Sequence, residues 1–410
     1  MDSIWLYLEP FTFISEDETH YLFYNSRDKN NLSIPKKGMV RKVITQLMNV
    51  DQLYSVKIKV NDLEEEILFH FIKAIQSLGY GDIIDGDSEK PIIFPPLLNL
   101  QQSIERLRKH DVPFGWNILS YLHEALFYIN GVCSLDCTDC QDTMRQCAYC
   151  TKSNDILNFD ALKNFLFSIS HSKASIVLLG GNVFLYPELD ALMSLLDEMD
   201  NPYTLVSDWR NIPTSDVLTQ LSSYKSLHLR ILHKGAYDRE RVWKVAKEIE
   251  ACHLDQSWEF LVSSEEEYEE ASLLEERLGD FAKVWIKPFY NGQNEAFFES
   301  YVYTDQDELK SIALTRQNIF ALQALNTNDF GKITIMSDGS VYANVNEKPL
   351  GTIQDPIKDL LCKELESKNT WRRTRYDLEP CSHCRFKLIC PSPSNYERVI
   401  GKNNLCHILK

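Results

Sequence analysis

The chain has 410 residues, more than one small module needs, which suggests two or three folded units. Hydrophobic residues make up 44% and charged residues 25%, proportions that exclude a wholly disordered or collagenous chain. With 43 Lys and Arg against 59 Asp and Glu, the net charge of -16 excludes a general basic surface for nucleic acid. The sequence shows no signal-like start and no membrane-length apolar run, so we expect a cytoplasmic protein without a membrane partner.

The N-terminal residues combine extended and helical patterns. Aromatic-rich segments at 11–14 and 21–24 flank polar residues and predict a β-hairpin. The apolar spacing of residues 39–48 and 63–78 predicts two helices. A stretch rich in Asp, Gly and Pro at residues 81–96 then predicts a linker and the first domain boundary.

From residue 125 on, short apolar strands alternate with helical stretches. This alternation predicts a parallel α/β sheet with its functional residues at the carboxyl ends of the strands. The six strands that we expect, enough for a partial barrel, are 126–129, 175–179, 203–207, 226–232, 257–263 and 283–288. The helices expected between them are 157–170, 187–200, 214–221, 238–251 and 265–278. A later hairpin at 333–342 and a helix at 355–368 complete the pattern.

The eleven cysteines are concentrated in two parts of the chain. The first group is Cys133, Cys137, Cys140, Cys147 and Cys150, and the second is Cys381, Cys384, Cys390 and Cys406. An odd number of cysteines in a chain expected to be cytoplasmic favours metal or cluster ligation over disulfides.

The spacing within the first group indicates a soft metal centre. Cys133, Cys137 and Cys140 are separated by three and two residues, so one loop can wrap around the centre. Three thiolates leave a fourth position open, which suits an iron–sulfur cluster. A structural zinc site completed by Cys147 or Cys150 is the alternative. In the second group, four thiolates supply a complete shell for one cluster or for zinc.

A first strand followed by this cysteine spacing resembles the radical SAM superfamily, in which three cysteines hold a 4Fe-4S cluster whose open iron binds S-adenosyl-L-methionine. The segment Gly180-Gly181-Asn182 resembles the Gly-Gly-Glu segment that holds the methionyl amino group in that family. Ser207, after the third strand, stands where the family often has a polar contact. The resemblance implies a partial (β/α)6 barrel in which these four residues bind S-adenosyl-L-methionine, and it assigns no catalytic residue.

The C-terminal spacing resembles the SPASM extension of peptide-modifying radical SAM enzymes, which usually carries two auxiliary clusters. Asn344 and Ser394 stand where that pattern has two cysteines of the first auxiliary cluster. The resemblance therefore implies one auxiliary 4Fe-4S cluster, and two clusters in the whole chain. The ligands of the auxiliary cluster would be the four C-terminal cysteines, Cys381, Cys384, Cys390 and Cys406.

Segments 21–25, 287–292 and 390–397 are similar to the pseudo-rSAM proteins of the GG-Bacteroidales peptide system. The N-terminal pattern resembles the RiPP recognition element, a winged-helix-like α+β module that binds a precursor leader as an added strand. A cap that only covers the barrel is the alternative. The implied domains are 1–95 for leader binding, 96–124 as linker, 125–325 as the radical SAM-like barrel and 326–410 as the SPASM-like part.

The resemblance implies maturation of a ribosomally synthesised precursor peptide, with or without a partner maturase. The three intact cysteines favour a working radical SAM enzyme. Asp139 and Asn182 favour a catalytically inactive scaffold that binds the peptide or a partner, because the family has an aromatic residue and Glu at these positions. A zinc-stabilised binding protein is a further alternative.

Overall fold

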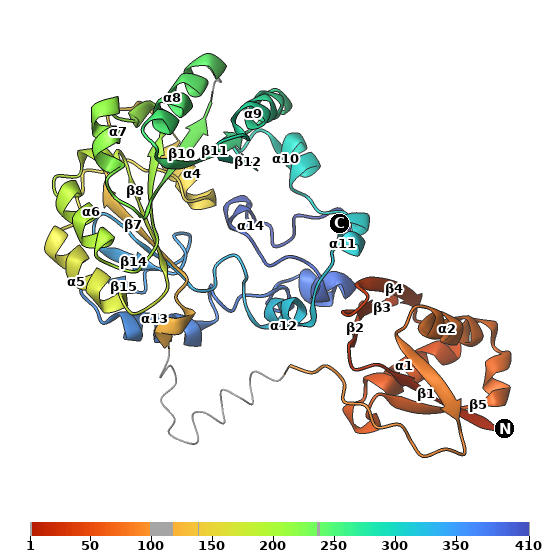
Figure 1. The fold of residues 1–410 in the computed structure, drawn as a ribbon. Coiled ribbons are helices and arrows are strands. Elements are labelled where there is room, and N and C mark those ends of the chain that lie inside the picture. Colours follow the sequence, from red (N-terminus) through yellow and green to blue (C-terminus); the bar gives the residue numbers. More distant parts are fainter. Residues whose placement is uncertain (1, 99–117, 138, 236–237, 410) are drawn as a thin grey trace.

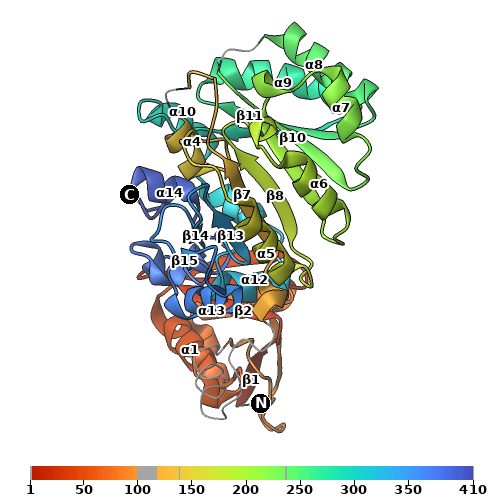
Figure 2. The ribbon, with the colours of Figure 1, turned by 90° about the vertical axis from the view of Figure 1, so that its left-hand side faces the viewer.

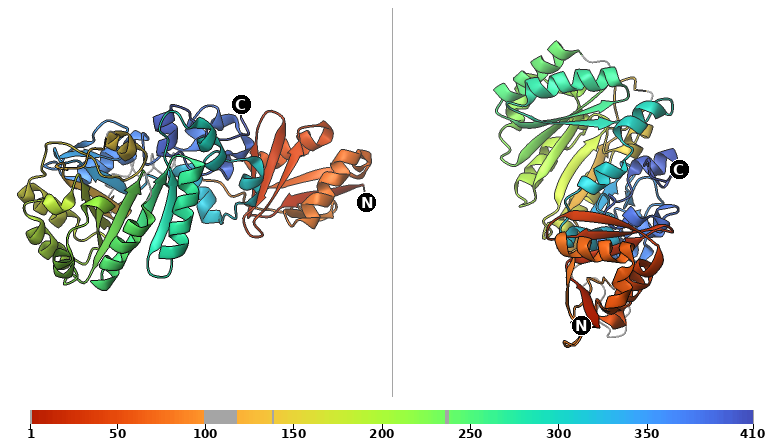
Figure 3. Two further views of the ribbon diagram at one scale, coloured as in Figure 1. Left: turned by 90° about the horizontal axis from the view of Figure 1, so that it is seen from above. Right: turned by 90° about the vertical axis from the view of Figure 1, so that its right-hand side faces the viewer.

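The computed structural model describes residues 2–98, 118–137, 139–235 and 238–409. An N-terminal part lies at one end of an elongated molecule, and the rest of the chain is built on one large sheet (Figures 1 and 3). Within these ranges, no helix combines the length and the apolar character needed to span a bilayer. Most of the linker expected at residues 96–124 lies outside the described residues, which resume at residue 118.

The N-terminal part contains two three-stranded antiparallel sheets, ordered β5-β1-β6 and β2-β3-β4. Its strands are β1 (Ser3–Leu8), β2 (Thr12–Glu16), β3 (His20–Asn25), β4 (Asn30–Pro35), β5 (Ser55–Lys59) and β6 (Gly81–Asp85). Its helices are α1 (Gly38–Met48) and α2 (Glu66–Ser77).

The predicted N-terminal hairpin is confirmed as β2 and β3, and the two predicted helices are confirmed as α1 and α2. The predicted start of the linker at Gly81 is wrong, because residues 81–85 form β6 and pair with β1. On β1, the buried side chains of Ile4, Leu6 and Leu8 alternate with partly exposed ones and pack into the same core as both helices. Pairing with this distant strand makes residues 81–85 extended.

A nine-stranded sheet with the order β12-β11-β10-β9-β8-β7-β13-β14-β15 forms the centre of the rest of the chain. Its strands are β7 (Glu124–Asn130), β8 (Ser175–Gly180), β9 (Tyr203–Asp208), β10 (Leu227–Lys234), β11 (Asp255–Val262), β12 (Lys283–Pro288), β13 (Lys332–Ile335), β14 (Ser340–Tyr342) and β15 (Gly351–Thr352). Strands β7 to β12 are mutually parallel and confirm the six predicted strands. The predicted C-terminal hairpin, β13 and β14, joins this sheet because β13 pairs in parallel with β7.

The helices that connect the parallel strands are α5 (Phe159–Ile169), α6 (Leu189–Asp197), α7 (Ser215–Leu221), α8 (Arg239–Ala251) and α9 (Glu265–Leu278), as predicted. The other helices among the described residues are α4 (Cys140–Gln146), α10 (Glu295–Tyr301), α11 (Gln306–Ser311), α12 (Arg316–Ala324), α13 (Ile357–Ser367) and α14 (Asn395–Ile400). Of these, α13 confirms the helix predicted at 355–368.

The two faces of the parallel sheet have different partners. Helices α5 to α9 cover one face and bury the main core, which includes Phe127 and Trp258 (Figures 1 and 2). The opposite face, called the inner face here, carries Tyr128 and Leu232, which cluster with residues of the α4 region. The Tyr396 hydroxyl of α14 donates to a carbonyl of β12, so the C-terminal segment lies over this inner face.

The sheet of β2, β3 and β4 packs against the cysteine-rich end of the chain. Phe13 and Tyr24 share an apolar cluster with Phe386 of the 3-10 helix η8 (Arg385–Leu388). The Tyr24 hydroxyl accepts the Leu314 N–H at 2.6 Å, which ties the same sheet to the segment before α12. The first and last parts of the chain therefore share one interface.

An ion pair between Asp17 and Arg385 joins the two sides of this interface, and their side chains are 20% and 16% exposed. Burial by itself raises the pKa of Asp17. Hydrogen bonds from the backbone of Thr19 and His20 and from Arg385 outweigh burial and lower this pKa to about 2. The folded-state pKa thus lies below the ordinary value of 3.8, so the ionised carboxylate stabilises the fold above about pH 4. That contribution is lost as the pH falls from about 4 to about 2.

We expect Asp17→Asn to lower the free energy of unfolding at pH 7 by about 2 kcal/mol, since the hydrogen-bonded ion pair is lost. Urea unfolding at several pH values measures this difference, which should shrink as the pH falls through 4 toward 2. Asp87→Asn changes an exposed carboxylate of the same part of the chain and serves as the matched control. If Asp17→Asn lowered the free energy of unfolding by the same amount at pH 2 as at pH 7, the stabilising role of the ionised Asp17 carboxylate would be contradicted.

Candidate metal centre and cofactor site

The three cysteines with the cluster-like spacing lie in one loop between β7 and α4. Cys133 and Cys137 follow the end of β7, and Cys140 is the first residue of α4. The loop therefore lies at the carboxyl end of the first parallel strand, as the sequence predicts. The backbone N–H of Leu135 donates to Cys133 Sγ at 3.4 Å.

The three thiols also lie in one electrostatic neighbourhood. Burial, followed by the neighbouring thiols of Cys137 and Cys133, raises the pKa of Cys140 to about 11. A bound cationic centre would relieve this repulsion, because metals bind thiolates and displace their protons.

The described side chains do not form a ready site for a single metal ion. Within the described ranges, which omit Thr138 of this loop, no group of three or more Cys, His, Asp or Glu side chains could hold a metal ion as it stands. An iron–sulfur cluster binds each thiolate through a different iron, so its ligands are spread more widely than those of one ion. Three thiols on one loop, with an N–H donor directed at a sulfur, are the kinds of group that hold such a cluster.

Arg210 is a site residue that sequence reasoning missed. At the end of β9, the fully buried Asp208 accepts two hydrogen bonds of 2.8 Å from the Arg210 guanidinium. The same guanidinium donates to Cys137 Sγ at 3.2 Å, and Asn211 Nδ2 lies 3.7 Å from Cys133 Sγ. Hydrogen bonds to cluster sulfurs tune iron–sulfur centres. The only signal in the sequence is that these residues follow a parallel strand.

Gly180 and Gly181 allow a close approach between the ends of β7 and β8. A Cβ atom on Gly180 would lie 2.1 Å from the Asn130 carbonyl oxygen. A Cβ atom on Gly181 would lie 2.6 Å from the carbonyl oxygens of Gly131 and Val132. The Gly181 N–H donates to Asn130 at 2.6 Å. The two glycines therefore fix the backbone that leads into the cysteine loop.

The polar groups of Asn182 and Ser207 have partners within the chain. Asn182 Oδ1 accepts the Phe184 N–H at 3.1 Å and caps the 3-10 turn that follows β8. Ser207 is 1% exposed, and its hydroxyl donates to the Asp208 carbonyl at 3.2 Å. Binding of S-adenosyl-L-methionine by Gly180, Gly181, Asn182 and Ser207 stays a prediction.

Asp139, which precedes the third cysteine, forms an ion pair with Lys234 at the end of β10. Lys234 Nζ also donates to Thr143 Oγ1 at 2.9 Å and lies 3.5 Å from the centre of the Phe289 ring. A cation–π contact of this kind adds to the ion pair. Residues from β10 and from the end of β12 thus reach the loop that follows β7.

Cys147 and Cys150, whose roles the sequence leaves open, face different surroundings. Burial, with Glu259 next, raises the pKa of Cys147 to about 12. Burial, with Asp208 next and then Cys140, raises the pKa of Cys150 well above its ordinary value. Cys150 is therefore the one that lies beside the three-cysteine loop.

The four C-terminal cysteines lie in one neighbourhood as well. Burial raises the pKa of Cys381 and of Cys384, and the thiol of Cys406 raises both further. Burial raises the pKa of Cys390 to about 12, and the thiols of Cys381 and Cys384 contribute to that shift. The four thiols of the predicted auxiliary site are therefore close enough to influence one another's pKa, and their binding of one cluster stays a prediction.

Arg375 holds this C-terminal segment together. Its guanidinium forms a 2.5 Å ion pair with Glu397 and donates to the carbonyls of Pro391 and Asn403 at 2.8 and 2.9 Å. It also lies 3.9 Å from Cys381 Sγ. The guanidinium therefore joins three chain segments beside the cysteines.

Asn344 and Ser394 belong to a polar network. Asn344 Nδ2 donates to Asp329 at 3.0 Å and to Asn395 at 2.6 Å. The Ser394 hydroxyl donates to Glu397 at 2.9 Å in a capping box at the start of α14. Where the resemblance has cysteines, this chain uses hydrogen bonds to fix α14 against the sheet.

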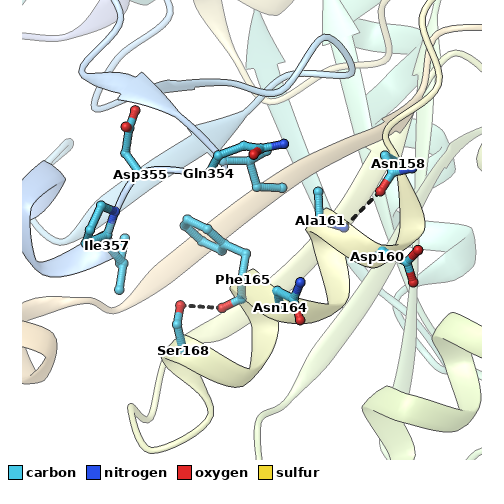
Figure 4. A pocket seen from close by; sticks show the side chains of 11 residues that line it. Asn158, Asp160, Ala161, Asn164, Phe165, Ser168, Gln354, Asp355 and Ile357 are labelled. Carbon is cyan, nitrogen blue, oxygen red and sulfur yellow. Dashed lines mark hydrogen bonds between the residues drawn. The ribbon is translucent and has the colours of Figure 1, made fainter.

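A cavity of about 390 Å³, called the inner cavity here, lies between the inner face and the C-terminal segment. A second hollow, of about 470 Å³, lies between α5 and the segment before α13, where Asn158, Phe165 and Gln354 line it (Figure 4). That hollow contains none of the predicted site residues. The inner cavity is lined by Cys147, Asn344 and Ser394 among others, so it contains residues of the first cysteine group and of the C-terminal polar network.

No family model matches the sequence, and no curated protein matches it. Among solved structures, the fold is similar to that of Streptococcus suis SuiB bound to S-adenosylmethionine, with a TM-score of 0.51, 13% identity and 97% of both chains covered. Streptococcus suis SuiB bound to precursor peptide SuiA gives a TM-score of 0.52, also at 13% identity over 97% of each chain. At this identity the likeness concerns the fold, and it supports the α/β fold expected from the radical SAM resemblance.

Proposed function

We propose that this protein acts in the maturation of a ribosomally synthesised peptide, as a radical SAM-type iron–sulfur protein. The observation that carries the proposal is the loop of Cys133, Cys137 and Cys140 at the end of the first parallel strand, with Arg210 directed at one of its sulfurs. The fold around this loop matches SuiB over 97% of the chain. SuiB has been crystallised with S-adenosylmethionine and with a precursor peptide, which supports both as ligands here.

The proposed cofactors are S-adenosyl-L-methionine and two 4Fe-4S clusters, one on the three-cysteine loop and one on Cys381, Cys384, Cys390 and Cys406. When bound, the first cluster and S-adenosyl-L-methionine supply hydrogen-atom abstraction from the peptide. In this chain, Arg210 and Asn211 donate hydrogen bonds to the loop sulfurs, and Gly180 and Gly181 permit the backbone approach that positions the loop.

Each proposed domain has its own role. Residues 1–95 bind the leader, 96–124 form the linker, 125–325 form the radical SAM-like barrel and 326–410 form the SPASM-like part. Within the described residues, β5 and β6 each pair on one side only, so both offer an edge to an added strand. This supports leader binding by strand addition to the first sheet.

The second candidate is a scaffold without catalytic activity, as in the pseudo-rSAM proteins of the GG-Bacteroidales peptide system, which binds the peptide or a partner maturase. Two contacts favour it. Asn182 Oδ1 is engaged by the Phe184 N–H, and Asp139 is engaged by Lys234, so neither group is free to contact a cofactor without rearrangement.

Anaerobic reconstitution followed by iron and sulfide analysis tests the proposal. We expect about eight iron and eight sulfide ions per chain, and about half of each after Cys133→Ala, Cys137→Ala and Cys140→Ala are combined. Incubation with dithionite and S-adenosyl-L-methionine should then yield 5′-deoxyadenosine from the wild type and none from the triple variant. Cys252→Ala, at a cysteine outside both groups, is the matched control.

The outcomes separate the candidates. Both clusters without 5′-deoxyadenosine would support the scaffold. Zinc in both sites without sulfide would contradict the iron–sulfur assignment and leave the zinc-stabilised binding protein.

A further inference from the structure

The inner cavity has a mixed polar and apolar wall. Its residues come from the inner face, from α4 and from the C-terminal segment, so it is enclosed by three parts of the chain. They include Glu124, Leu126, Tyr128, Met144, Arg230, Lys287, Asp329, Lys332, Asn344 and Tyr396. A volume of about 390 Å³ is enough for one or two amino-acid side chains and too small for a folded partner.

Arg230 lines this cavity from β10. Its neighbours Leu229 and Ile231 belong to the core on the helix-covered side, so the alternation of the strand directs Arg230 to the inner face. Its Nε is buried without a hydrogen-bond partner. Nor does Arg230 form an ion pair with any other residue of the described ranges.

The two lysines of the cavity wall, unlike Arg230, have carboxylate partners. Lys287 pairs with Glu259 at 2.8 Å, and Lys332 pairs with Glu124 at 3.7 Å. Glu259 lies on β11, the strand next to that of Arg230. Its carboxylate oxygen Oε1, which does not contact Lys287, has no hydrogen-bond partner, so Glu259 does not bind the Arg230 guanidinium.

The second carboxylate of the cavity wall, that of Asp329, is also paired. Asp329 accepts hydrogen bonds from Asn344 at 3.0 Å and from Asn326 at 3.1 Å, and lies 3.4 Å from Arg398. The described wall therefore has one positive charge without a counter-charge, that of Arg230.

A partly buried guanidinium without an anion is unfavourable, because desolvation of the charge is not repaid by pairing. Its planar fork of N–H donors matches the two oxygens of a carboxylate. The apolar side chains of Leu126, Tyr128 and Met144 in the same wall can contact the methylene groups that carry such a carboxylate.

We infer that the inner cavity binds the side-chain carboxylate of an Asp or Glu residue of the peptide substrate, held by Arg230. This inference rests on the proposed function, since it names the class of side chain that the peptide presents to the sheet. Arg230 would be a specificity-determining residue, because an uncharged amide in the same place would leave the guanidinium unpaired.

Ligand-observed NMR on the full-length reconstituted protein tests this inference with three probes: N-acetyl-glutamate amide, N-acetyl-glutamine amide and glutarate. We expect the glutamate derivative to bind about tenfold or more tightly than the glutamine derivative, which is the same size but uncharged. Glutarate, a free dicarboxylate, should bind no more tightly than the glutamate derivative. Tighter binding of glutarate would assign the cavity to a small free acid and overturn the peptide assignment.

Arg230→Gln should abolish the preference for the glutamate derivative, and Arg230→Lys should retain part of it, because a charge remains without the fork. Lys225→Gln removes an exposed charge just before β10 and should leave binding of the glutamate derivative unchanged. Equal binding of the two derivatives by the wild type, or no binding of either, would overturn the inference even if the Arg230 variants fail to fold. These probes need neither S-adenosyl-L-methionine nor a leader, so their failure is distinguishable from absence of 5′-deoxyadenosine, which concerns the proposed function.

Discussion

Replacement of Gly180 by alanine is expected to lower the free energy of unfolding by about 3 kcal/mol or more. The added Cβ would lie 2.1 Å from the carbonyl oxygen of Asn130, a backbone atom of a buried central strand that has no room to move aside. Relief of this overlap requires β7 and β8 to separate at their carboxyl ends. Because β7 leads into the three-cysteine loop, we expect iron incorporation at that loop to fall as well.

Chemical unfolding of the full-length protein measures the first effect, and iron analysis after anaerobic reconstitution measures the second. Gly292→Ala is the matched control, since nothing lies within 4 Å of its added Cβ. Its φ of +82° still makes alanine unfavourable by about 1 kcal/mol. Equal losses in the two variants would show that the close approach of β7 and β8 is not what requires Gly180.

Arg375→Met is expected to lower the free energy of unfolding by about 3–5 kcal/mol, because it leaves the buried Glu397 carboxylate without its cationic partner. The side chains of Arg375 and Glu397 are 9% and 3% exposed. The variant also removes the hydrogen bonds to the carbonyls of Pro391 and Asn403, which flank the C-terminal cysteines. We therefore expect loss of the proposed C-terminal cluster together with retention of the proposed cluster on the three-cysteine loop.

Thermal or urea unfolding and iron content measure these two effects on the same samples. Arg41→Met, at an exposed position of α1, is the matched control and should change the free energy of unfolding by less than about 0.5 kcal/mol. A loss below about 1 kcal/mol in Arg375→Met would mean that solvent, and not Arg375, compensates the Glu397 carboxylate.

Local patterns predicted most of the parallel sheet. Strands β7 to β12 are short apolar segments between turn signals, and the connecting helices carry local caps such as Ser264, whose hydroxyl accepts the Glu267 N–H at 3.2 Å. These signals act within a few residues, so sequence alone carries them. The predicted boundaries of the strands lie close to the observed ones for the same reason.

Elements that depend on distant pairing were harder to predict. Strand β6, at residues 81–85, has the composition of a linker and is extended because it pairs with β1. Likewise, β13 pairs with β7, although about two hundred residues separate them in the chain. Backbone hydrogen bonds of this kind carry no signature in the sequence of either partner.

The sequence by itself determined the candidate cluster ligands, because Cys133, Cys137 and Cys140 belong to one loop and their spacing is a local property. Only the tertiary structure decided what surrounds them. Arg210 comes from the end of β9 and Lys234 from the end of β10, while Arg230 faces the inner cavity. A parallel sheet brings the carboxyl ends of its strands to one edge, but strand order and register select which side chains meet there. Strand order and register are set by the pairing of strands over the whole sheet. No short stretch of sequence contains the information that decides this pairing.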